Sequence, residues 1–224
     1  YISVAEHVMM SVLALSRDLV NADKAVRADN WKFRETNIPH EVAEKVLLIV
    51  GLGRIGRNVA KKAQAFDMEV MAFDPFITAE QMAEIGVKKA ETLDDGLKVA
   101  DFITIQLHLT EETRGMMSTK QFEMMKPTAS LINLSRGPVV DQAALCKALE
   151  THEIASAALD VLEHEPPAAD EPIFKLPNVI LTPHFGGDTI EAKRRCSRKL
   201  AETLVEAVSG GAPYNWANRK AMEK

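Results

Sequence analysis

The sequence predicts an α/β fold built on a doubly wound parallel sheet of the Rossmann type. The first observation behind this prediction is the apolar run KVLLIV at residues 45–50, which ends at a glycine and is typical of a strand buried on both faces. The second is the recurrence of short apolar runs along the chain, with segments of helical apolar spacing between most of them. Strands and helices that alternate in this way assemble into one parallel sheet covered by helices.

The predicted elements follow one another in a regular order. Residues 4–19 keep apolar side chains at three-to-four spacing, which predicts an amphipathic helix with Ser3 as its N-cap. A helical continuation is expected at 21–28 and a loop at 29–44. Strands are predicted at 45–50, 69–73, 102–106, 130–134, 155–159 and 179–181, and helices at 55–66, 78–85, 119–125, 142–150 and 188–209.

The composition is that of an ordinary globular protein and argues against several classes of function. The 224 residues include 27 basic and 32 acidic side chains, and the net charge of −5 argues against a nucleic-acid-binding protein. The longest apolar runs have the length of a strand, so no membrane-spanning helix is expected. Cys146 and Cys196 lie in helix-like stretches without disulfide or metal-site spacing, which indicates a reducing compartment and predicts a cytoplasmic location.

Residues 51–56, with the sequence GLGRIG, form a G-x-G-x-x-G pattern between the first buried strand and the helix that follows it. In this context the pattern predicts a dinucleotide-binding turn, and a glycine-rich turn that binds no ligand is the alternative. Gly51 permits the tight turn, Gly53 lets the backbone approach a pyrophosphate, and Gly56 allows close packing of helix on strand. The phosphates would lie at the helix N-terminus, where free N–H groups and the helix dipole favour an anion.

Asp74 indicates which dinucleotide is bound. It closes the second predicted strand, EVMAFD, which places its carboxylate near the adenosine ribose of a bound dinucleotide. A carboxylate at this place accepts hydrogen bonds from the ribose hydroxyls and repels a 2′-phosphate. Arg54 could instead accommodate a 2′-phosphate, but its position within the glycine turn suits the pyrophosphate better. We therefore predict NAD as the cofactor, in preference to NADP.

Three reactive side chains, Arg136, Glu165 and His184, each come shortly after a predicted strand in the second half of the chain. Because ligands bind outside the carboxyl ends of parallel strands, we expect these side chains to converge on one cleft. An arginine offers a forked pair of hydrogen bonds to a carboxylate, and a His–Glu pair makes an oriented proton donor. Beside a nicotinamide, these groups are what the reduction of a 2-keto acid needs.

The motifs ISVAEHV, VGLGRIGRNVA, LINLSRGPVVD, ALDVLEHEPP and LTPHFGG occur in this order along the chain. Together they resemble the D-isomer-specific 2-hydroxyacid dehydrogenase family over essentially the whole chain. The resemblance implies hydride transfer between NAD and a small 2-hydroxy or 2-keto acid. It also implies that Arg136 binds the substrate carboxylate, that His184 is the acid/base, and that Glu165 keeps His184 protonated and oriented.

The resemblance further implies a set of residues that contact the cofactor. Asp160 matches the family residue that contacts the nicotinamide carboxamide, with a structural role in the turn after its strand as the alternative. His108 replaces the proline of many relatives, from which we expect altered local rigidity rather than lost function. The other implied contacts are Arg54, Ile55, Leu107, His108, Leu134, Ser135, Gly186 and Gly187, in addition to Gly51, Gly53, Gly56 and Asp74.

The acid at position 165 bears on the subfamily. The motif ISVAEHV resembles formate dehydrogenases, but those carry glutamine at the position of Glu165, because formate oxidation has no hydroxyl proton to transfer. The glutamate favours a reversible 2-hydroxyacid reaction, such as that of 3-phosphoglycerate, hydroxypyruvate or glyoxylate. A formate dehydrogenase and a non-catalytic NAD-sensing protein, similar to corepressors of this family, are the alternatives.

Three residues near these motifs receive other interpretations. Glu163 is the alternative acid to Glu165, which we prefer because it precedes Pro166 at the position of the family motif. His7, on the first predicted helix, is interpreted as a packing residue rather than a catalytic one. His164 lacks the recurrent ligand spacing of a metal centre, so we expect no metal site.

The resemblance also bears on domains and assembly, because family members carry roughly 100 further residues, a typical small-domain length, ahead of the ISVAEHV motif. We expect residues 1–211 to form the NAD-binding domain, with 1–44 supplying an interdomain helix and dimer contacts. Residues 212–224 are expected to be a remnant of a substrate-binding domain that is otherwise missing from the chain. The family implies a homodimer, with residues 4–31 supplying much of the contact. From these residues alone we expect NAD binding without efficient catalysis.

Overall fold

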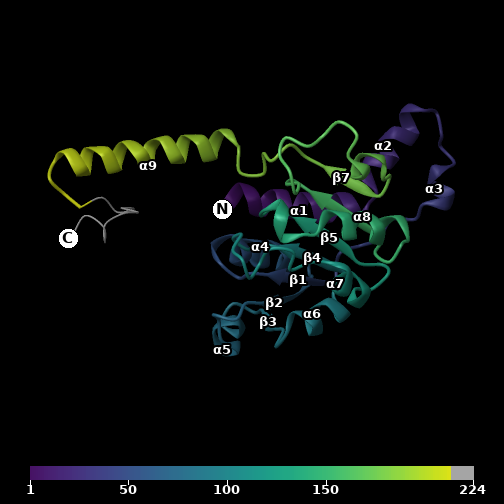
Figure 1. Cartoon of the computed structure of the whole chain (residues 1–224), viewed down its shortest axis with the longest axis horizontal. Helices are drawn as coiled ribbons and strands as arrows, with labels where there is room; N and C mark the ends of the chain where they lie inside the picture. The colour runs from purple at the N-terminus through teal and green to yellow at the C-terminus, as the bar shows by residue number, and fades with distance from the viewer. Residues whose placement is uncertain (213–224) are drawn as a thin grey trace. The chain divides into compact units, whose positions relative to one another are not determined.

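The computed structural model describes residues 1–212 and contains one parallel sheet of seven strands in the order β3-β2-β1-β4-β5-β6-β7 (Figure 1). From β1 the chain builds outward through β2 and β3, and then returns to place β4 on the other side of β1. Open parallel sheets bind ligands at the carboxyl ends of the strands where the order reverses in this way. The strands are β1 (Val46–Val50), β2 (Glu69–Phe73), β3 (Lys88–Lys89), β4 (Phe102–Ile105), β5 (Ser130–Asn133), β6 (Ser156–Leu159) and β7 (Val179–Leu181).

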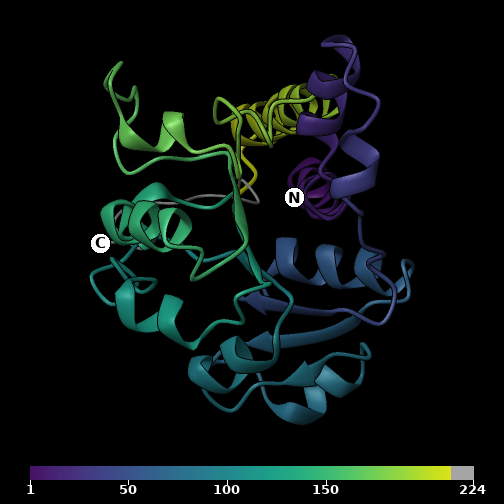
Figure 2. The same cartoon turned by 90° about the vertical axis from the view of Figure 1, so that its right-hand side faces the viewer.

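Helices cover both faces of the sheet (Figure 2). Helices α1, α4 and α5 pack on one face, and α6, α7 and α8 pack on the other. The helices are α1 (Ile2–Ser16), α2 (Leu19–Arg27), α3 (Phe33–Thr36), α4 (Arg54–Gln64), α5 (Ala79–Ala83), α6 (Leu93–Val99), α7 (Thr119–Met124), α8 (Gln142–Glu150) and α9 (Ile190–Val208), with the 3-10 helices η1 (Gly137–Val139) and η2 (Pro172–Lys175).

Strand β1 shows why its sequence is continuously apolar. Leu47 and Ile49 belong to the core cluster on the α1 and α4 face, whereas Leu48 and Val50 belong to the cluster on the α6 to α8 face. All four side chains are fully buried. A strand with one covered face needs an apolar residue at every second position, and a strand with two covered faces needs one at every position. The prediction of a doubly wound sheet is therefore confirmed, and so is the burial of its central strand on both faces.

The predicted order of strands and helices is confirmed, with ends displaced by up to three residues. Two details that were predicted for the N-terminal region are wrong. Ser3 is not the N-cap of α1: the N-cap is Tyr1, whose carbonyl oxygen accepts the N–H of Ala5, and Ser3 lies buried within the first turn. The loop predicted at 29–44 contains the short helix α3.

Two further elements were not predicted from the sequence, the edge strand β3 and the helix α6, which packs on β1 and β2. Strand β3 consists of two lysines, which carry no apolar signal, at the outer side of β2. Helix α6 contains Gly96, a residue that lowers helix propensity. The glycine is required by packing, because an added Cβ would lie 2.7 Å from Leu48 Cδ1. Tertiary contact with the sheet thus overrides local propensity in α6.

The chain divides into two compact units, residues 1–186 and 187–224. The first unit contains the sheet and the helices that cover it. The second contains α9, whose N-cap Thr189 accepts a hydrogen bond from the N–H of Ala192. Apart from residue 212, the predicted remnant at 212–224 lies outside the described residues. The predicted domain boundary at 211 stays a prediction.

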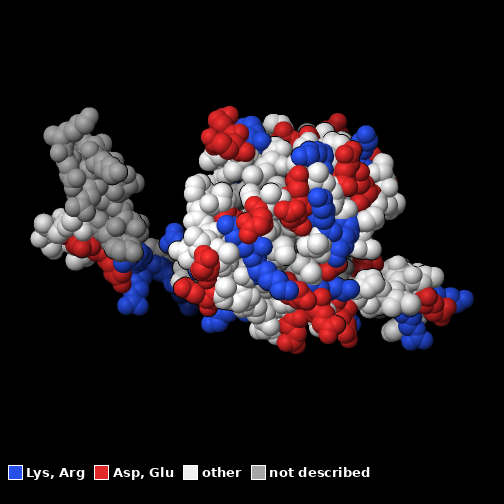
Figure 3. All heavy atoms as spheres, turned by 90° about the horizontal axis from the view of Figure 1, so that it is seen from below, with Lys and Arg blue, Asp and Glu red and all other residues white. Residues whose placement is uncertain are grey.

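Two surface properties follow from the described residues. None of the helices within residues 1–212 combines the length and the apolar character needed to cross a lipid bilayer. Basic and acidic side chains are interspersed over the face of the first unit that Figure 3 shows. Interspersed charges of this kind are typical of a solvated protein surface.

Two glycines in the turn between β1 and α4 have opposite surroundings. A Cβ added at Gly56 would clash with the carbonyl oxygen of Gly51 and lie 3.2 Å from Ile49 Cγ2. A Cβ added at Gly53 would meet no atom within 4 Å. Gly56 therefore allows α4 to approach β1, whereas Gly53 leaves open space above the turn.

We expect Gly56→Ala to lower the free energy of unfolding by about 1–3 kcal/mol, because the added methyl group forces α4 away from β1. Gly53→Ala is the matched control. It should change the free energy of unfolding by less than about 0.5 kcal/mol, since the space is open and the backbone φ of −72° suits any residue. Urea unfolding followed by circular dichroism measures both variants. Equal losses in the two would contradict the packing argument.

Candidate functional site

The glycine turn lies at the carboxyl edge of the sheet, where β1 meets the end of β4. Gly51 has a φ of +97°, which residues with a side chain rarely adopt. A Cβ there would lie 2.8 Å from both the carbonyl oxygen of Gln106 and Leu107 Cδ2. The N–H of Leu52 donates to Asp74 Oδ2 at 2.9 Å. The structure thus brings three sequence-predicted cofactor residues, Gly51, Leu107 and Asp74, to one place.

Helix α4 begins at this turn, with Gly53 as its N-cap and no capping side chain. The first N–H groups of an α-helix have no partner within the helix, so an uncapped N-terminus favours an anion. Arg54 is exposed and Ile55 half-buried at the start of α4. Open space at Gly53, free backbone donors and an exposed guanidinium together fit the pyrophosphate of a dinucleotide.

Asp74 follows β2 and is held by the backbone around it. Its Oδ1 accepts the N–H of Phe76 at 3.0 Å, and its Oδ2 accepts the N–H of Leu52. These bonds fix the carboxylate and leave further lone pairs on both oxygens. Phe76, next to it, is 91% exposed. The fixed carboxylate fits the ribose hydroxyls of a dinucleotide whose phosphates lie at α4.

The ends of β4 and β5 supply the next group of predicted cofactor residues. His108 is exposed, and its carbonyl oxygen accepts a hydrogen bond from Thr113 Oγ1 at 2.7 Å within the loop after β4. Leu134 and Ser135 are buried after β5, and the Ser135 hydroxyl donates to Asn133 Oδ1 at 2.9 Å. These residues lie at the same carboxyl edge as the glycine turn. Their individual roles toward a cofactor stay predictions.

His184 and Glu165 form a direct pair. His184 Nδ1 lies 2.6 Å from Glu165 Oε2, and Glu165 Oε1 accepts the N–H of Leu162 at 3.0 Å. Because a carboxylate only accepts, Nδ1 carries the proton of this bond, and Nε2 takes no part in it. Glu163, the alternative acid, makes no hydrogen bond to His184 in the described part of the chain; its own N–H donates to Gln142 Oε1.

Arg136 reaches the same pair because the loops after β5 and β6 pack tightly. A Cβ at Gly137 would clash with the carbonyl oxygen of Leu162, so glycine permits this approach. The exposed Arg136 donates through Nη1 to the preceding carbonyl oxygen at 2.7 Å. A cavity of about 160 Å³ is lined by Arg136, Glu165 and His184 together. The structure therefore brings Arg136, Glu165 and His184 together, and these residues follow the neighbouring strands β5, β6 and β7.

The carboxylate of Asp160, only 3% exposed, holds the turn at 182–186. Its Oδ1 accepts hydrogen bonds from Thr182 Oγ1 at 2.6 Å and from the N–H of Phe185 at 3.1 Å. Its Oδ2 accepts the N–H of Gly186 at 2.8 Å. A structural role for Asp160 was the alternative expected from the sequence, but in the turn after β6, whereas the turn that Asp160 holds follows β7. A contact between Asp160 and the nicotinamide carboxamide stays a prediction.

His7 on α1 contacts the same turn, which the sequence analysis missed. Its Nε2 lies 3.3 Å from Thr182 Oγ1, and its ring packs edge-on against Phe185 with centroids 5.2 Å apart. Burial lowers the pKa of the His7 imidazole below its ordinary value, and the charge of Asp160 opposes this effect. The motif ISVAEHV contains His7, but helical spacing cannot show which distant loop a side chain meets.

The two predicted glycines after His184 differ in their surroundings. Gly186 is buried, and an added Cβ would lie 2.9 Å from Asp160 Oδ2 and 3.2 Å from Leu134 Cδ2. Gly187 is exposed and is the first residue of the second compact unit. Gly186 therefore allows the turn to lie directly on β5 and β6.

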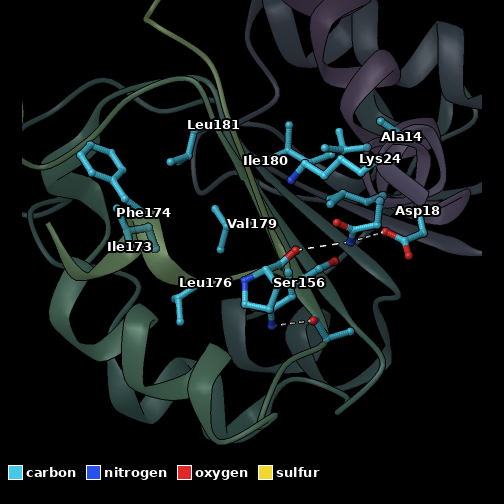
Figure 4. A pocket seen from close by; sticks show the side chains of 16 residues that line it. Ala14, Asp18, Lys24, Ser156, Ile173, Phe174, Leu176, Val179, Ile180 and Leu181 are labelled. Atoms are coloured by element: carbon cyan, nitrogen blue, oxygen red, sulfur yellow. Dashed lines mark hydrogen bonds between the residues drawn. The ribbon is translucent and has the colours of Figure 1, made fainter. Parts of the chain in front are cut away.

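Two larger cavities lie near β7. One, of about 430 Å³, borders His184 and Glu165 and is otherwise mainly apolar, with Leu162, Pro166, Pro167, Phe174, Leu181 and Pro183. The other, of about 450 Å³, lies between α1, α2 and β7 (Figure 4). Asn21 Nδ2 donates there to Asp18 Oδ1 and to the carbonyl oxygen of Pro177. The second cavity contains none of the predicted reactive side chains.

Within residues 1–212, no group of three or more histidine, cysteine, aspartate or glutamate side chains is placed to hold a metal ion. The donors that converge at the carboxyl edge are instead backbone N–H groups, a guanidinium and an imidazole–carboxylate pair.

Known proteins resemble the chain in sequence and structure. Residues 9–186 match the model of the D-isomer specific 2-hydroxyacid dehydrogenase, NAD binding domain. The chain is 39% identical over 222 residues to D-3-phosphoglycerate dehydrogenase of Archaeoglobus fulgidus, covering 99% of this chain and 42% of that protein. D-lactate dehydrogenase with NAD+ from Lactobacillus jensenii has a TM-score of 0.86 and 31% identity, over 95% of this chain and 67% of that one. An acyclic imino acid reductase in complex with NADPH and D-Arg has a TM-score of 0.86 and 29% identity, over 96% and 67%.

The family match covers most of the chain and includes the glycine turn, Asp74, Arg136, Glu165 and His184. The chain spans 42% of the length of its Archaeoglobus relative, so the match concerns one part of a larger enzyme. The chain belongs to the D-isomer specific 2-hydroxyacid dehydrogenase family and contains its NAD-binding domain.

Proposed function

We propose that this protein is an NAD-dependent oxidoreductase that transfers a hydride between nicotinamide and a small D-2-hydroxy acid or 2-keto acid. The observation that carries the proposal is the 2.6 Å contact between His184 Nδ1 and Glu165 Oε2, in a cavity that Arg136 also lines. The same edge of the sheet presents the glycine turn. A proton donor, a cation for a carboxylate and a dinucleotide turn at one edge suit the reduction of a 2-keto acid.

In the proposed reduction, the glycine turn and Asp74 would hold NADH, which would supply the hydride that C2 of the keto acid needs. Arg136 donates a forked pair of hydrogen bonds to the substrate carboxylate, which fixes the position of C2 and its carbonyl oxygen. His184 Nε2–H gives its proton to that oxygen as negative charge develops there, which completes the 2-hydroxy acid. Glu165 holds the ring through Nδ1, so Nε2 faces the substrate. In the oxidation the proton returns to Nε2.

The proposed substrates are 3-phosphoglycerate, hydroxypyruvate or glyoxylate. Similarity to a phosphoglycerate dehydrogenase supports the first. Among the residues that line the two cavities at His184, however, Arg136 is the only lysine or arginine. With Arg136 on the substrate carboxylate, a phosphate group would need a cation from another part of the protein. The cavities of this chain by themselves favour an unphosphorylated substrate such as hydroxypyruvate or glyoxylate.

We also propose a homodimer that forms through the N-terminal part of the nucleotide-binding domain. Residues 1–44 expose a group of large apolar side chains, each at least 39% accessible to solvent: Leu19, Val20, Val26, Trp31 and Ile38. Exposed apolar side chains gathered in one region are typical of a protein–protein interface. A cytoplasmic location is part of the same proposal and rests on the free thiols of Cys146 and Cys196.

We expect His184→Ala in the full gene product to lower kcat for reduction of the 2-keto acid by about 10²–10⁴-fold, because the proton donor is lost. The affinity for NADH should stay nearly unchanged. The assay follows NADH consumption with glyoxylate, hydroxypyruvate, 3-phosphohydroxypyruvate and other 2-keto acids, and NADH binding is measured by calorimetry. His164→Ala, which removes an exposed neighbouring histidine, is the matched control.

Three outcomes of this assay would contradict the proposal. Unchanged turnover in His184→Ala would remove His184 from the mechanism. Binding of NADH without turnover of any keto acid would indicate a non-catalytic NAD-binding protein. Turnover of formate and NAD+ alone would indicate a formate dehydrogenase.

We expect Asp74→Ala to reduce the preference for NADH over NADPH by about tenfold, or ~1.4 kcal/mol, because the carboxylate no longer repels a 2′-phosphate. Calorimetric titration with the two cofactors measures the ratio of dissociation constants. Asp94→Ala removes an acid in the first turn of α6 and serves as the control for net charge. A preference that is equal in wild type and Asp74→Ala would contradict the ribose role.

We expect light scattering to give twice the 24.7 kDa mass of the chain. Trp31→Glu should shift the protein toward monomer, because Trp31 is 64% exposed within the proposed interface. Phe76→Glu is the matched control: this side chain is 91% exposed but lies outside the region. A monomeric wild type, or equal dissociation in the two variants, would contradict the proposed interface.

A further inference from the structure

The acid/base candidate His184 has an unusual backbone conformation. Its φ of +52° lies in the left-handed region, which a residue with a side chain adopts at a cost. Such a conformation persists where the surroundings determine it, and it is common at active sites. The groups that bind the turn at residues 182–186 therefore determine whether His184 reaches Glu165.

The residues on both sides of His184 are bound to a single buried carboxylate. Before His184, Thr182 Oγ1 donates to Asp160 Oδ1; after it, the N–H groups of Phe185 and Gly186 donate to the two oxygens of Asp160. Asp160 therefore holds the turn through the Thr182 hydroxyl and two backbone N–H groups, and it makes no ring contact with Phe185.

His7 touches both of these flanking residues. Its Nε2 lies 3.3 Å from Thr182 Oγ1, and its ring packs edge-on against Phe185 at an interplanar angle of 86°. His7 comes from α1, which packs against α4, β5 and β6 and carries a fully buried face. The side chain of His7 thus contacts the turn at two points, Thr182 and Phe185. It extends from a helix that is packed against the sheet.

The hydrogen bonds determine which ring nitrogen of His7 carries a proton. Thr182 has one hydroxyl proton, and the 2.6 Å bond gives it to the Asp160 carboxylate. Toward His7, Thr182 Oγ1 can then only accept, so His7 Nε2 must be the donor. A neutral His7 is therefore the Nε2–H tautomer. The two hydrogen bonds therefore point the same way: His7 donates to Thr182, and Thr182 donates to Asp160.

We propose that His7 is a positioning residue that fixes the Thr182–Gly186 turn and thereby the contact of His184 with Glu165. This proposal rests on the proposed function, in which His184 is the acid/base. His7 acts through two separable contacts, a hydrogen bond to Thr182 and a ring contact with Phe185. It does not touch the reacting atoms.

Three variants separate these contacts from general stability. His7→Phe keeps a ring against Phe185 and removes the donor to Thr182. His7→Gln places an amide donor near the position of Nε2 and is the conservative rescue. Val12→Ala is the matched control, because Val12 is fully buried on the same helix, five positions after His7. Thermal unfolding of all variants measures the general loss of stability.

The first readout is the NMR spectrum of the histidine side chains in the 224-residue chain, which needs no catalysis. Nitrogen–proton correlation should identify wild-type His7 as the Nε2–H tautomer and should show a hydrogen-bonded Nδ1 proton on His184. We expect His7→Phe to lose the His184 resonance through exchange, and His7→Gln and Val12→Ala to keep it. An Nδ1–H tautomer of wild-type His7, or an unchanged His184 resonance in His7→Phe, would overturn the proposal.

The second readout is steady-state kinetics of the full gene product. We expect His7→Phe to lower kcat by about ten- to hundredfold, the size of effect caused by a misplacement of about 1 Å, with KM and the NADH dissociation constant nearly unchanged. His7→Gln should recover most of the loss. If Val12→Ala with the same loss of thermal stability lowers kcat equally, the role of His7 is merely structural and the proposal fails. If the wild type reduces no keto acid, the proposed function fails, and the NMR spectra still decide the positioning role.

Discussion

The buried carboxylate of Asp160 is the constraint on which the geometry of the site depends. A negative charge that is only 3% exposed is tolerated where hydrogen-bond donors replace the water it has lost. Thr182, Phe185 and Gly186 supply those donors, and all three belong to the turn after β7. The turn is therefore held to the end of β6, and His184, in its middle, is directed at Glu165.

The parallel sheet explains how residues far apart in the chain meet in one site. The glycine turn lies at the end of β1, where the strand order reverses, and Arg136, Glu165 and His184 follow β5, β6 and β7. All strands point the same way, so every loop that follows a strand emerges at one edge. Gly137 brings the loops after β5 and β6 into contact, since a side chain there would clash with Leu162. An extended dinucleotide along this edge would reach from the glycine turn to the His184–Glu165 pair.

Elements with a local sequence pattern could be predicted from the sequence. Elements that form because of contacts with distant parts of the chain could not. The apolar run of β1 and the glycine spacing after it specify a buried strand and a nucleotide turn within a few residues. Strand β3 and helix α6 are decided by contact with the sheet, as the packing of Gly96 on Leu48 shows. The pairing of Glu165 with His184 was expected from family motifs, whose order carries information that spacing lacks. The contact of His7 with Thr182 joins residues 175 positions apart, and no local pattern reports it.

The His184–Glu165 pair is partly exposed to solvent, and this exposure limits what the pair can do in the proposed reaction. The side chains of His184 and Glu165 are 52% and 37% exposed, although the Asp160 carboxylate that holds their turn is only 3% exposed. Water at such a pair competes with the substrate for the proton and weakens every electrostatic interaction in the site. In the proposed function, α1, β6 and the 182–186 turn orient His184 as the proton donor, whereas they do not exclude water from it. The reduction of a 2-keto acid that we propose for this edge therefore requires a cover from outside the residues that line its cavities.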